Sequence, residues 1–125
     1  MNRKVSVAPM MDCTDRHERF FLRLISKNTL LYSEMVVSEA IHRGDKKKLL
    51  EFNINEKPIA LQIGGSSPTL LAEATKAGED FGYDEINLNL GCPSKKVWCM
   101  FDERTKLSCR LLEQNAIGYK VAGHD

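Results

Sequence analysis

The strongest constraint on the fold is the run YDEINLNLGCPSK at residues 83–95. Apolar Ile86, Leu88 and Leu90 alternate in it with Asn87 and Asn89, which is the two-residue period of a β-strand. The pattern predicts an apolar strand from about residue 85 to residue 89, which delivers an amide, a glycine and Cys92 at its carboxyl end.

This strand is predicted to stop abruptly after Leu90, at Gly91 and Pro93. Proline cannot donate a ladder hydrogen bond, and glycine tolerates torsion angles that other residues avoid. Cys92 would thus lie at the carboxyl end of the strand, where parallel α/β folds hold their functional groups. A thiol at that place is a candidate proton donor or nucleophile. The alternative is a small buried side chain beside a turn.

Strand patterns alternate with helix patterns over the first ninety or so residues. The predicted strands are Lys4 to Ala8, Leu30 to Tyr32, Ile59 to Ile63 and Glu85 to Asn89. Between them lie a helix at Asp15 to Ser26, one or two short helices within Ser38 to Phe52, broken near Gly44, and a helix from Ser67 to about Phe81. Such alternation predicts βαβ units and a parallel sheet, and so an α/β fold.

Both longer helices have a start signal. Thr14 or Asp15 can accept hydrogen bonds from the first amides of one, and Ser67 followed by Pro68 is a strong start for the other. The first helix carries apolar residues at helical spacing, namely Phe20, Phe21, Leu24 and Ile25. The second is expected to bury Leu70, Leu71, Ala74 and Ala77.

The composition excludes some classes of function but indicates no activity. The 125 residues carry a formal charge of +1, so no overall basic field indicates nucleic acid. The four cysteines form no C-x-x-C pair, which argues against a zinc site. We find no signal peptide and no long apolar segment, and we therefore expect reduced thiols in a cytoplasmic protein.

Four segments together resemble the flavin-dependent tRNA-dihydrouridine synthases, most closely the branch that modifies uridines 20 and 20a of the D-loop. The segments, in the order and spacing of that family, are SVAPMMDCTDRH at residues 6–17, LYSEMV at 31–36, PIALQIGGSSP at 58–68 and GYDEINLNLGCPSKKV at 82–97. The resemblance implies a TIM (β/α)8 barrel. Because 125 residues are about half of what such a barrel needs, we expect its N-terminal part only, with about four β/α units.

The resemblance also implies roles for five residues. Pro9 and Met10 would pack beside FMN, and Gln62 would bind its polar edge. Asn89 would hold the uracil of a tRNA uridine, and Cys92 would give a proton to C5 after reduced FMN passes a hydride to C6. NADPH would be the reductant, and no metal is expected. Taken singly, Met10 could instead be ordinary core packing and Gln62 an amide satisfied at a strand end.

Residues 98–125 depart from the family pattern. MFDERTKLSCR at 100–110, back-translated and read one base later, can give CLMNEPNLVAD, which resembles the family's continuation. We interpret residues 1–97 as the N-terminal half of the barrel and residues 98–125 as a divergent, frameshifted tail. The C-terminal half-barrel and the helical tRNA-binding domain are then absent, and we expect the chain to be inactive alone. The alternative is a non-catalytic remnant that does not bind flavin.

Overall fold

The computed structural model describes residues 5–90 and 119–122. Its strands form one sheet in which every listed register is parallel, with the order β1-β3-β4-β5 and with β2 also paired to β3. The strands are β1 (Leu31–Tyr32), β2 (Val36–Val37), β3 (Ile59–Gly64), β4 (Glu85–Asn89) and β5 (Tyr119–Ala122). The helices are α1 (Arg16–Ile25), α2 (Ser38–Arg43), α3 (Lys46–Leu50), the 3₁₀ turn η1 (Ile54–Glu56) and α4 (Pro68–Asp80). The predicted α/β fold with a parallel sheet is confirmed.

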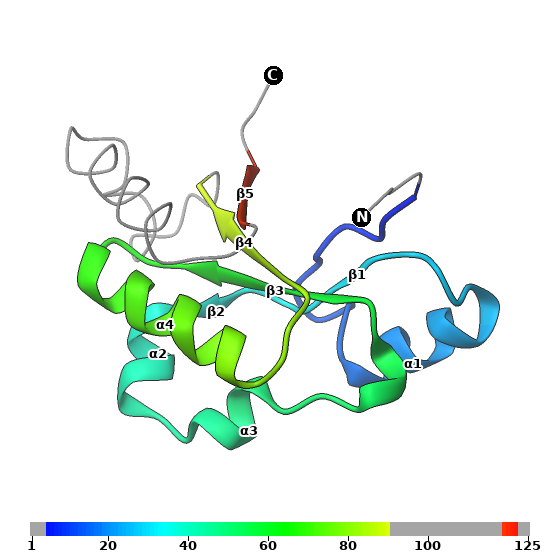
Figure 1. The fold of residues 1–125 in the computed structure, drawn as a ribbon, viewed down its shortest axis with the longest axis horizontal. Helices are drawn as coiled ribbons and strands as arrows, with labels where there is room; N and C mark the ends of the chain where they lie inside the picture. Colours follow the sequence, from blue (N-terminus) through cyan, green and yellow to red (C-terminus); the bar gives the residue numbers. More distant parts are fainter. Residues whose placement is uncertain (1–4, 91–118, 123–125) are drawn as a thin grey trace.

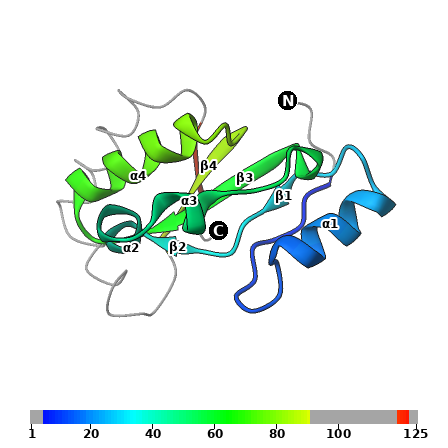
Figure 2. The same ribbon diagram turned by 90° about the horizontal axis from the view of Figure 1, so that it is seen from below.

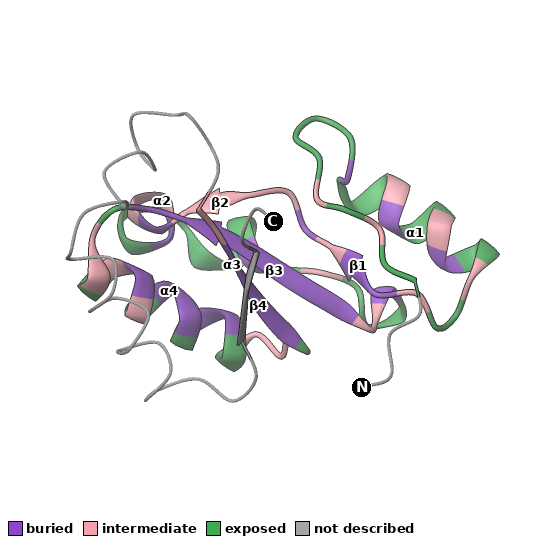
Figure 3. Ribbon diagram, turned by 90° about the horizontal axis from the view of Figure 1, so that it is seen from above, coloured by how far each residue is buried: buried purple, intermediate pink, exposed green. Residues whose placement is uncertain are grey.

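The helices lie on one side of the sheet. Figure 1 shows α2, α3 and α4 below β3 and β4, with α1 at the far end of the molecule beyond β1. The view from below, in Figure 2, has the same arrangement. β3 is the central strand, and all six of its residues are buried, as Figure 3 shows.

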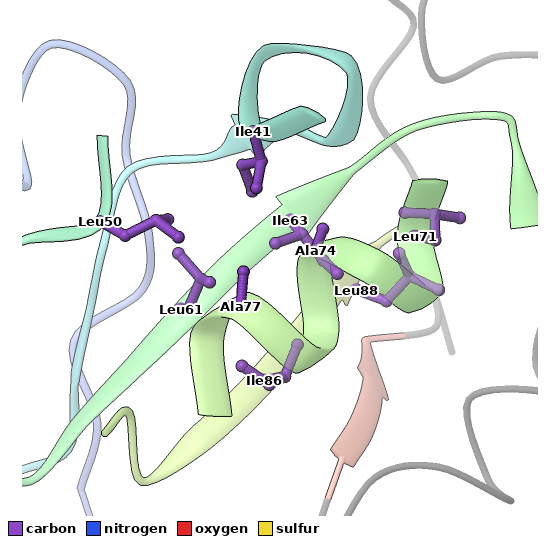
Figure 4. Packing of buried hydrophobic residues seen from close by; sticks show 9 residues of the cluster. All are labelled: Ile41, Leu50, Leu61, Ile63, Leu71, Ala74, Ala77, Ile86 and Leu88. Carbon is purple, nitrogen blue, oxygen red and sulfur yellow. The ribbon is translucent and has the colours of Figure 1, made fainter. Parts of the chain in front are cut away.

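The main core lies between β3, β4 and the helices α2 and α4. Figure 4 shows the cluster, which consists of Ile41, Leu50, Leu61, Ile63, Leu71, Ala74, Ala77, Ile86 and Leu88. Each fully buried leucine or isoleucine stabilises the fold by about 1.5–3 kcal/mol relative to an exposed one. Gly78 lets α4 approach the sheet closely, because a Cβ there would lie 2.5 Å from Ile86 Cδ1 and 2.8 Å from Leu61 Cδ2.

The predicted helix starts agree with the structure. Asp15 caps α1 by accepting hydrogen bonds from the amides of His17 and Glu18, and Ser67 caps α4 by accepting one from Leu70. Leu70 itself is only half-buried, so its predicted burial is wrong. It lies in the first turn of α4, whereas Leu71, Ala74 and Ala77 form the stripe that faces the sheet.

Helix α1 is attached to the rest of the protein by its arginines. Arg19 and Arg23 are buried, whereas four of the five apolar residues of this helix are exposed, with relative exposures of 48% for Phe20, 59% for Phe21, 71% for Leu24 and 69% for Ile25. The fifth, Leu22, is half-buried. Arg19 Nε donates to Glu56 Oε2 at 2.6 Å, and Arg23 donates to the carbonyls of Glu56 and Pro58. The predicted helix is confirmed, but its apolar side does not face the core.

The first predicted strand is much reduced. Within residues 5–8, Ser6 forms an isolated parallel bridge with Leu30, and the amide of Val7 donates to the carbonyl of Leu30. This segment therefore lies beside β1 at the edge of the sheet. The short strand β2 was not predicted from the sequence.

Candidate functional site

Successive residues of β3 and β4 point to opposite faces of the sheet. Leu61 and Ile63 of β3, and Ile86 and Leu88 of β4, belong to the core beneath the helices. Since side chains alternate along a strand, the intervening polar residues face the side away from the helices. Those residues are Gln62, Asn87 and Asn89, and the register pairs Gln62 with Asn87.

These three amides form a hydrogen-bonded row that runs from the middle of β3 and β4 to the carboxyl end of β4. Gln62 Nε2 donates to Asn87 Oδ1 at 2.7 Å, and Asn89 Nδ2 donates to Gln62 Oε1 at 3.3 Å. Gln62 and Asn87 are 6% and 5% exposed. Buried amides require partners, and because Gln62 is bound at both its nitrogen and its oxygen, one orientation of its amide is fixed.

The loop after β1 is tied to the same place. Ser33 Oγ accepts a hydrogen bond from the backbone amide of Gln62 at 3.0 Å and donates to the carbonyl of Glu34 at 2.8 Å. Ser33 is buried. This contact holds the end of β1 against the centre of β3, close to the amide row.

Pro9 and Met10 lie at the same edge of the sheet but farther along it. They follow residues 5–8, whose Ser6 bridges to Leu30 beside β1, and β1 therefore lies between this segment and β3. Met10 is 44% exposed, and its backbone amide and carbonyl both bond the hydroxyl of buried Thr14, at 2.9 and 3.0 Å. Met10 is thus not packed in the core. Its predicted role beside a flavin stays a prediction.

Of the five predicted site residues, the structure brings Gln62 and Asn89 into direct contact. Cys92, the predicted proton donor, lies outside the described residues. Sequence reasoning gave Asn87 no role, although the structure places it against Gln62. The available signal was its two-residue spacing from Asn89.

A separate cleft of about 710 Å³ lies between α1, the end of β1 and the segment from α3 to η1. Among its lining residues are Asp15, Arg16, Glu34, Glu56 and Tyr83. Gln62 and Asn89 are not among them. Asp15 and Arg16, which lie in the motif of residues 6–17 at the start of α1, therefore face this cleft rather than the amide row.

Two ionisable groups at this cleft are shifted. The backbone hydrogen bond from Glu18 lowers the pKa of exposed Asp15, the cap of α1. Burial raises the pKa of Tyr83 to about 12, and its hydroxyl donates to the carbonyl of Leu50 at 3.1 Å. Tyr83 accordingly stays protonated at neutral pH and acts as a structural hydrogen-bond donor.

Other site classes find little support within the part of the chain that the structure describes. Residues 5–90 and 119–122 contain no group of three or more His, Cys, Asp or Glu side chains that could hold a metal ion. Over those same ranges, no helix has the length and apolar character needed to cross a membrane. Cys13 is a free, exposed thiol.

The amide row has the chemistry that a flavin or a nucleobase requires. Both ligands present a polar edge of alternating donors and acceptors, which fixed amides can match. Gln62 Nε2 has two hydrogens, and the bond to Asn87 uses one of them. The residues present therefore fit such a ligand.

The comparisons with known proteins identify a family. The family model described as Dihydrouridine synthase (Dus) matches residues 6–117. A protein of Synechocystis named tRNA-dihydrouridine(20/20a) synthase is 60% identical over 93 residues, which cover 74% of this chain and 28% of the relative. The protein of that name from Pseudomonas aeruginosa is 55% identical over 124 residues, covering 99% of this chain and 33% of the relative. The one from Escherichia coli K12 is 58% identical over 94 residues, covering 75% and 27%.

The alignments differ in length. Two of these three relatives align over 93 and 94 residues, whereas the Pseudomonas aeruginosa protein aligns over 124. The family match itself extends to residue 117, beyond the last quoted motif, which ends at residue 97. The chain spans a third or less of the length of these relatives, between 27% and 33%. On the family match and these identities, the chain belongs to the dihydrouridine synthase family.

Proposed function

We propose that this chain is the N-terminal part of an FMN-dependent tRNA-dihydrouridine synthase. The complete enzyme would reduce the C5=C6 bond of uridine in the tRNA D-loop, with NADPH as reductant. The observation that carries the proposal is the hydrogen-bonded row of Gln62, Asn87 and Asn89, which ends at the carboxyl end of β4. Membership of the family supports it.

In this proposal Gln62 binds the polar edge of the flavin, with Asn87 holding its amide in one orientation. Pro9 and Met10 supply apolar contact from the segment beyond β1. Bound FMN, once reduced, supplies the hydride that C6 of the uracil receives. The task of these residues is to fix the reacting partners in position, since correct placement lowers the barrier of a two-partner reaction substantially.

Asn89 is proposed to hold the edge of the uracil. It already bonds Gln62, so the base and the flavin would be held by adjacent amides. The uridine must leave its stack to reach such a site, because both faces of the ring are needed for the reaction. Cys92 is proposed to give its thiol proton to C5. A thiol with an ordinary pKa near 8.5 is mostly protonated at neutral pH and can still donate.

The chain spans a third or less of the length of its relatives, and we propose that this part forms an incomplete barrel and is inactive alone. The frameshift interpretation of residues 98–125 belongs to the same proposal. Sequencing the underlying DNA tests it directly. If the neighbouring reading frame does not encode family-like sequence beyond residue 97, the interpretation is wrong.

A chimeric enzyme tests the function. Residues 6–90 of this chain replace the matching segment of the Pseudomonas aeruginosa relative, and dihydrouridine is measured in tRNA from cells without another synthase of this branch. We expect the chimera to purify with the yellow absorbance of FMN and to form dihydrouridine. Gln62→Ala should reduce flavin retention, whereas Asn89→Ala should reduce dihydrouridine formation more than flavin retention.

Glu73→Gln, an exposed change on the far side of α4, is the matched control and should leave both readings unchanged. A folded chimera that forms no dihydrouridine would refute the proposal. A chimera that is folded and colourless would favour the non-catalytic remnant.

A further inference from the structure

The hydrogen-bonded row of amides on β3 and β4 has a direction. Asn89 Nδ2 donates to Gln62 Oε1 at 3.3 Å, and Gln62 Nε2 donates to Asn87 Oδ1 at 2.7 Å. Both bonds therefore lead from the carboxyl end of β4 toward its middle. A reversed row, with every amide turned by 180°, would contain as many bonds, but donors and acceptors would exchange places. The direction of the row thus decides which atoms a ligand meets.

Asn87 is the acceptor on which the row ends. Its bond to Gln62 is the shorter of the two, so Asn87 restrains the Gln62 amide more tightly than Asn89 does. The register of β3 and β4 places Gln62 and Asn87 directly opposite each other. Both side chains are buried, so neither exchanges its partner for bulk water without a large cost.

Glu85 gives a physical reason for this direction. It lies two residues before Asn87 on the same face of β4, and it is buried. One of its carboxyl oxygens accepts a hydrogen bond from the hydroxyl of Tyr32 at 3.5 Å. An acceptor group attracts the N–H end of a neighbouring amide and repels its oxygen. This favours the arrangement in which the oxygen of Asn87 faces Gln62, as the structure has it.

Gln62 keeps one N–H for a ligand. Its Nε2 carries two hydrogens, and Asn87 accepts one of them. No other described side chain or backbone group accepts the second. The place beside Asn87 therefore offers a donor, whereas the reversed row would offer the carbonyl oxygen of Gln62 there.

We propose that Asn87 is a positioning residue that fixes the direction of the amide row and thereby makes Gln62 a hydrogen-bond donor to the ligand. The inference rests on the proposed function. The ligand atom that the site selects beside Asn87 is an acceptor, such as a carbonyl oxygen on the edge of the flavin. A ligand that presents an N–H there would face another donor and leave both unpaired.

Hydrogen exchange of the Gln62 side chain tests the direction without any ligand. The 125-residue chain is labelled with ¹⁵N-glutamine and measured by NMR. It contains two glutamines, Gln62 and Gln114, and the signal that Gln62→Glu removes is that of Gln62. Asn87→Leu should speed the exchange of the Gln62 side-chain protons about tenfold, because it removes their acceptor.

The same change at the other end of the row is the matched control. Asn89→Leu removes a donor to Gln62 Oε1 and leaves the bond to Asn87, so exchange should stay almost as slow as in the unmodified chain. The opposite pattern, or equal exchange in the two variants, would overturn the proposal. Circular dichroism checks each fold. If Asn87→Leu does not fold, Asn89→Leu still decides, because in a reversed row it alone would free the Gln62 protons.

Asn87→Asp separates the role of the acceptor from that of the shape of the side chain. Aspartate keeps an oxygen at this position and should preserve slow exchange. In a reversed row Asn87 would be a donor, and an ionised carboxylate could not replace it. Fast exchange in Asn87→Asp with an intact fold would therefore also overturn the proposal.

Bound FMN in the chimera tests the selected ligand atom. A hydrogen bond to a carbonyl oxygen lowers its infrared stretching frequency. Asn87→Leu should raise the frequency of one carbonyl band of bound FMN and weaken FMN binding about tenfold, whereas Asn87→Asp should keep the band in place. Unchanged bands in Asn87→Leu would overturn the selection of an acceptor atom. A folded chimera that binds no FMN would instead refute the proposed function, and the exchange pattern of the unliganded chain tells the two failures apart.

Discussion

Two glutamates in this protein bond a basic side chain at nearly equal distances but in very different surroundings, and this allows a sharp prediction. Arg19 Nε and Glu56 Oε2 are 2.6 Å apart, with side-chain exposures of 8% and 3%. His42 Nδ1 and Glu73 Oε2 are 2.7 Å apart, with exposures of 48% and 46%. The perturbation is the same in both, Glu56→Gln and Glu73→Gln, and it removes one formal charge with little change in shape.

The expected costs differ because of burial. Removing one partner of a buried pair costs about 3–5 kcal/mol, since it leaves a charge in the interior without compensation. Glu56 also accepts the amide of Asn53 through Oε1 at 2.9 Å, a bond that the glutamine oxygen can keep, so we expect the lower end of that range. For the exposed pair the cost is at most about 1 kcal/mol. A domain of this kind has about 5–15 kcal/mol in total, so only Glu56→Gln should bring it near unfolding.

Urea unfolding followed by circular dichroism measures both free energies at one pH and salt concentration. Glu56→Gln should move the midpoint far below that of the unmodified chain, and Glu73→Gln should leave it almost in place. Equal losses for the two variants would refute the argument from burial. A loss for Glu56→Gln below about 1 kcal/mol would show that Arg19 is solvated in the folded protein.

Three further predictions concern the core and its titration. The pKa of Tyr83 is raised from 10.0 to about 12, so the unfolded chain loses the phenol proton at a lower pH than the folded chain does. The contribution of this proton to the free energy of unfolding is therefore complete below pH 10 and is lost as the pH rises toward 12. Tyr83→Phe should flatten this part of the pH profile of stability, measured by urea unfolding. Gly78→Ala should destabilise the protein by about 1–3 kcal/mol, less the helix propensity that alanine gains, because the added Cβ would clash with Ile86 Cδ1. Ile86→Val removes that methyl group and should relieve the clash. The loss in the double variant should therefore be smaller than the sum of the losses in the two single variants. Leu71→Ala should cost about 2–5 kcal/mol in the same assay, and a smaller loss would mean that α4 settles into the cavity.

Most of the fold could be predicted because its elements carry local signals. The alternation in residues 85–89, and the serine and proline before α4, place a strand and a helix within a residue or two of their positions in the structure. The strand predicted at residues 4–8 shows the limit of such signals, because the structure has only one isolated bridge there, from Ser6 to Leu30. A segment at the edge of a sheet forms a regular strand only if its neighbour pairs with it, which its own sequence does not determine. The two-residue strand β2 is too short for a periodic pattern.

The orientation of α1 could not be predicted from spacing. Its apolar residues recur as they would on a core-facing helix, but the buried side is decided by Glu56, which is 37 residues away from Arg19 in the sequence. The contact between Gln62 and Asn89 was only partly foreseeable. Strand alternation puts Asn87 and Asn89 on one face, but the register that pairs Asn87 with Gln62 is set by the packing of both strands.

The two faces of β4 have a consequence for how this sequence can vary. Even-numbered positions 86 and 88 belong to the layer beneath the helices, whereas 87 and 89 belong to the amide row on the other face. A mutagenesis library confined to positions 87 and 89 would therefore change the amide row of the proposed site with little disturbance of the helix layer. Homologous proteins could diverge in specificity by the same route while they keep one scaffold.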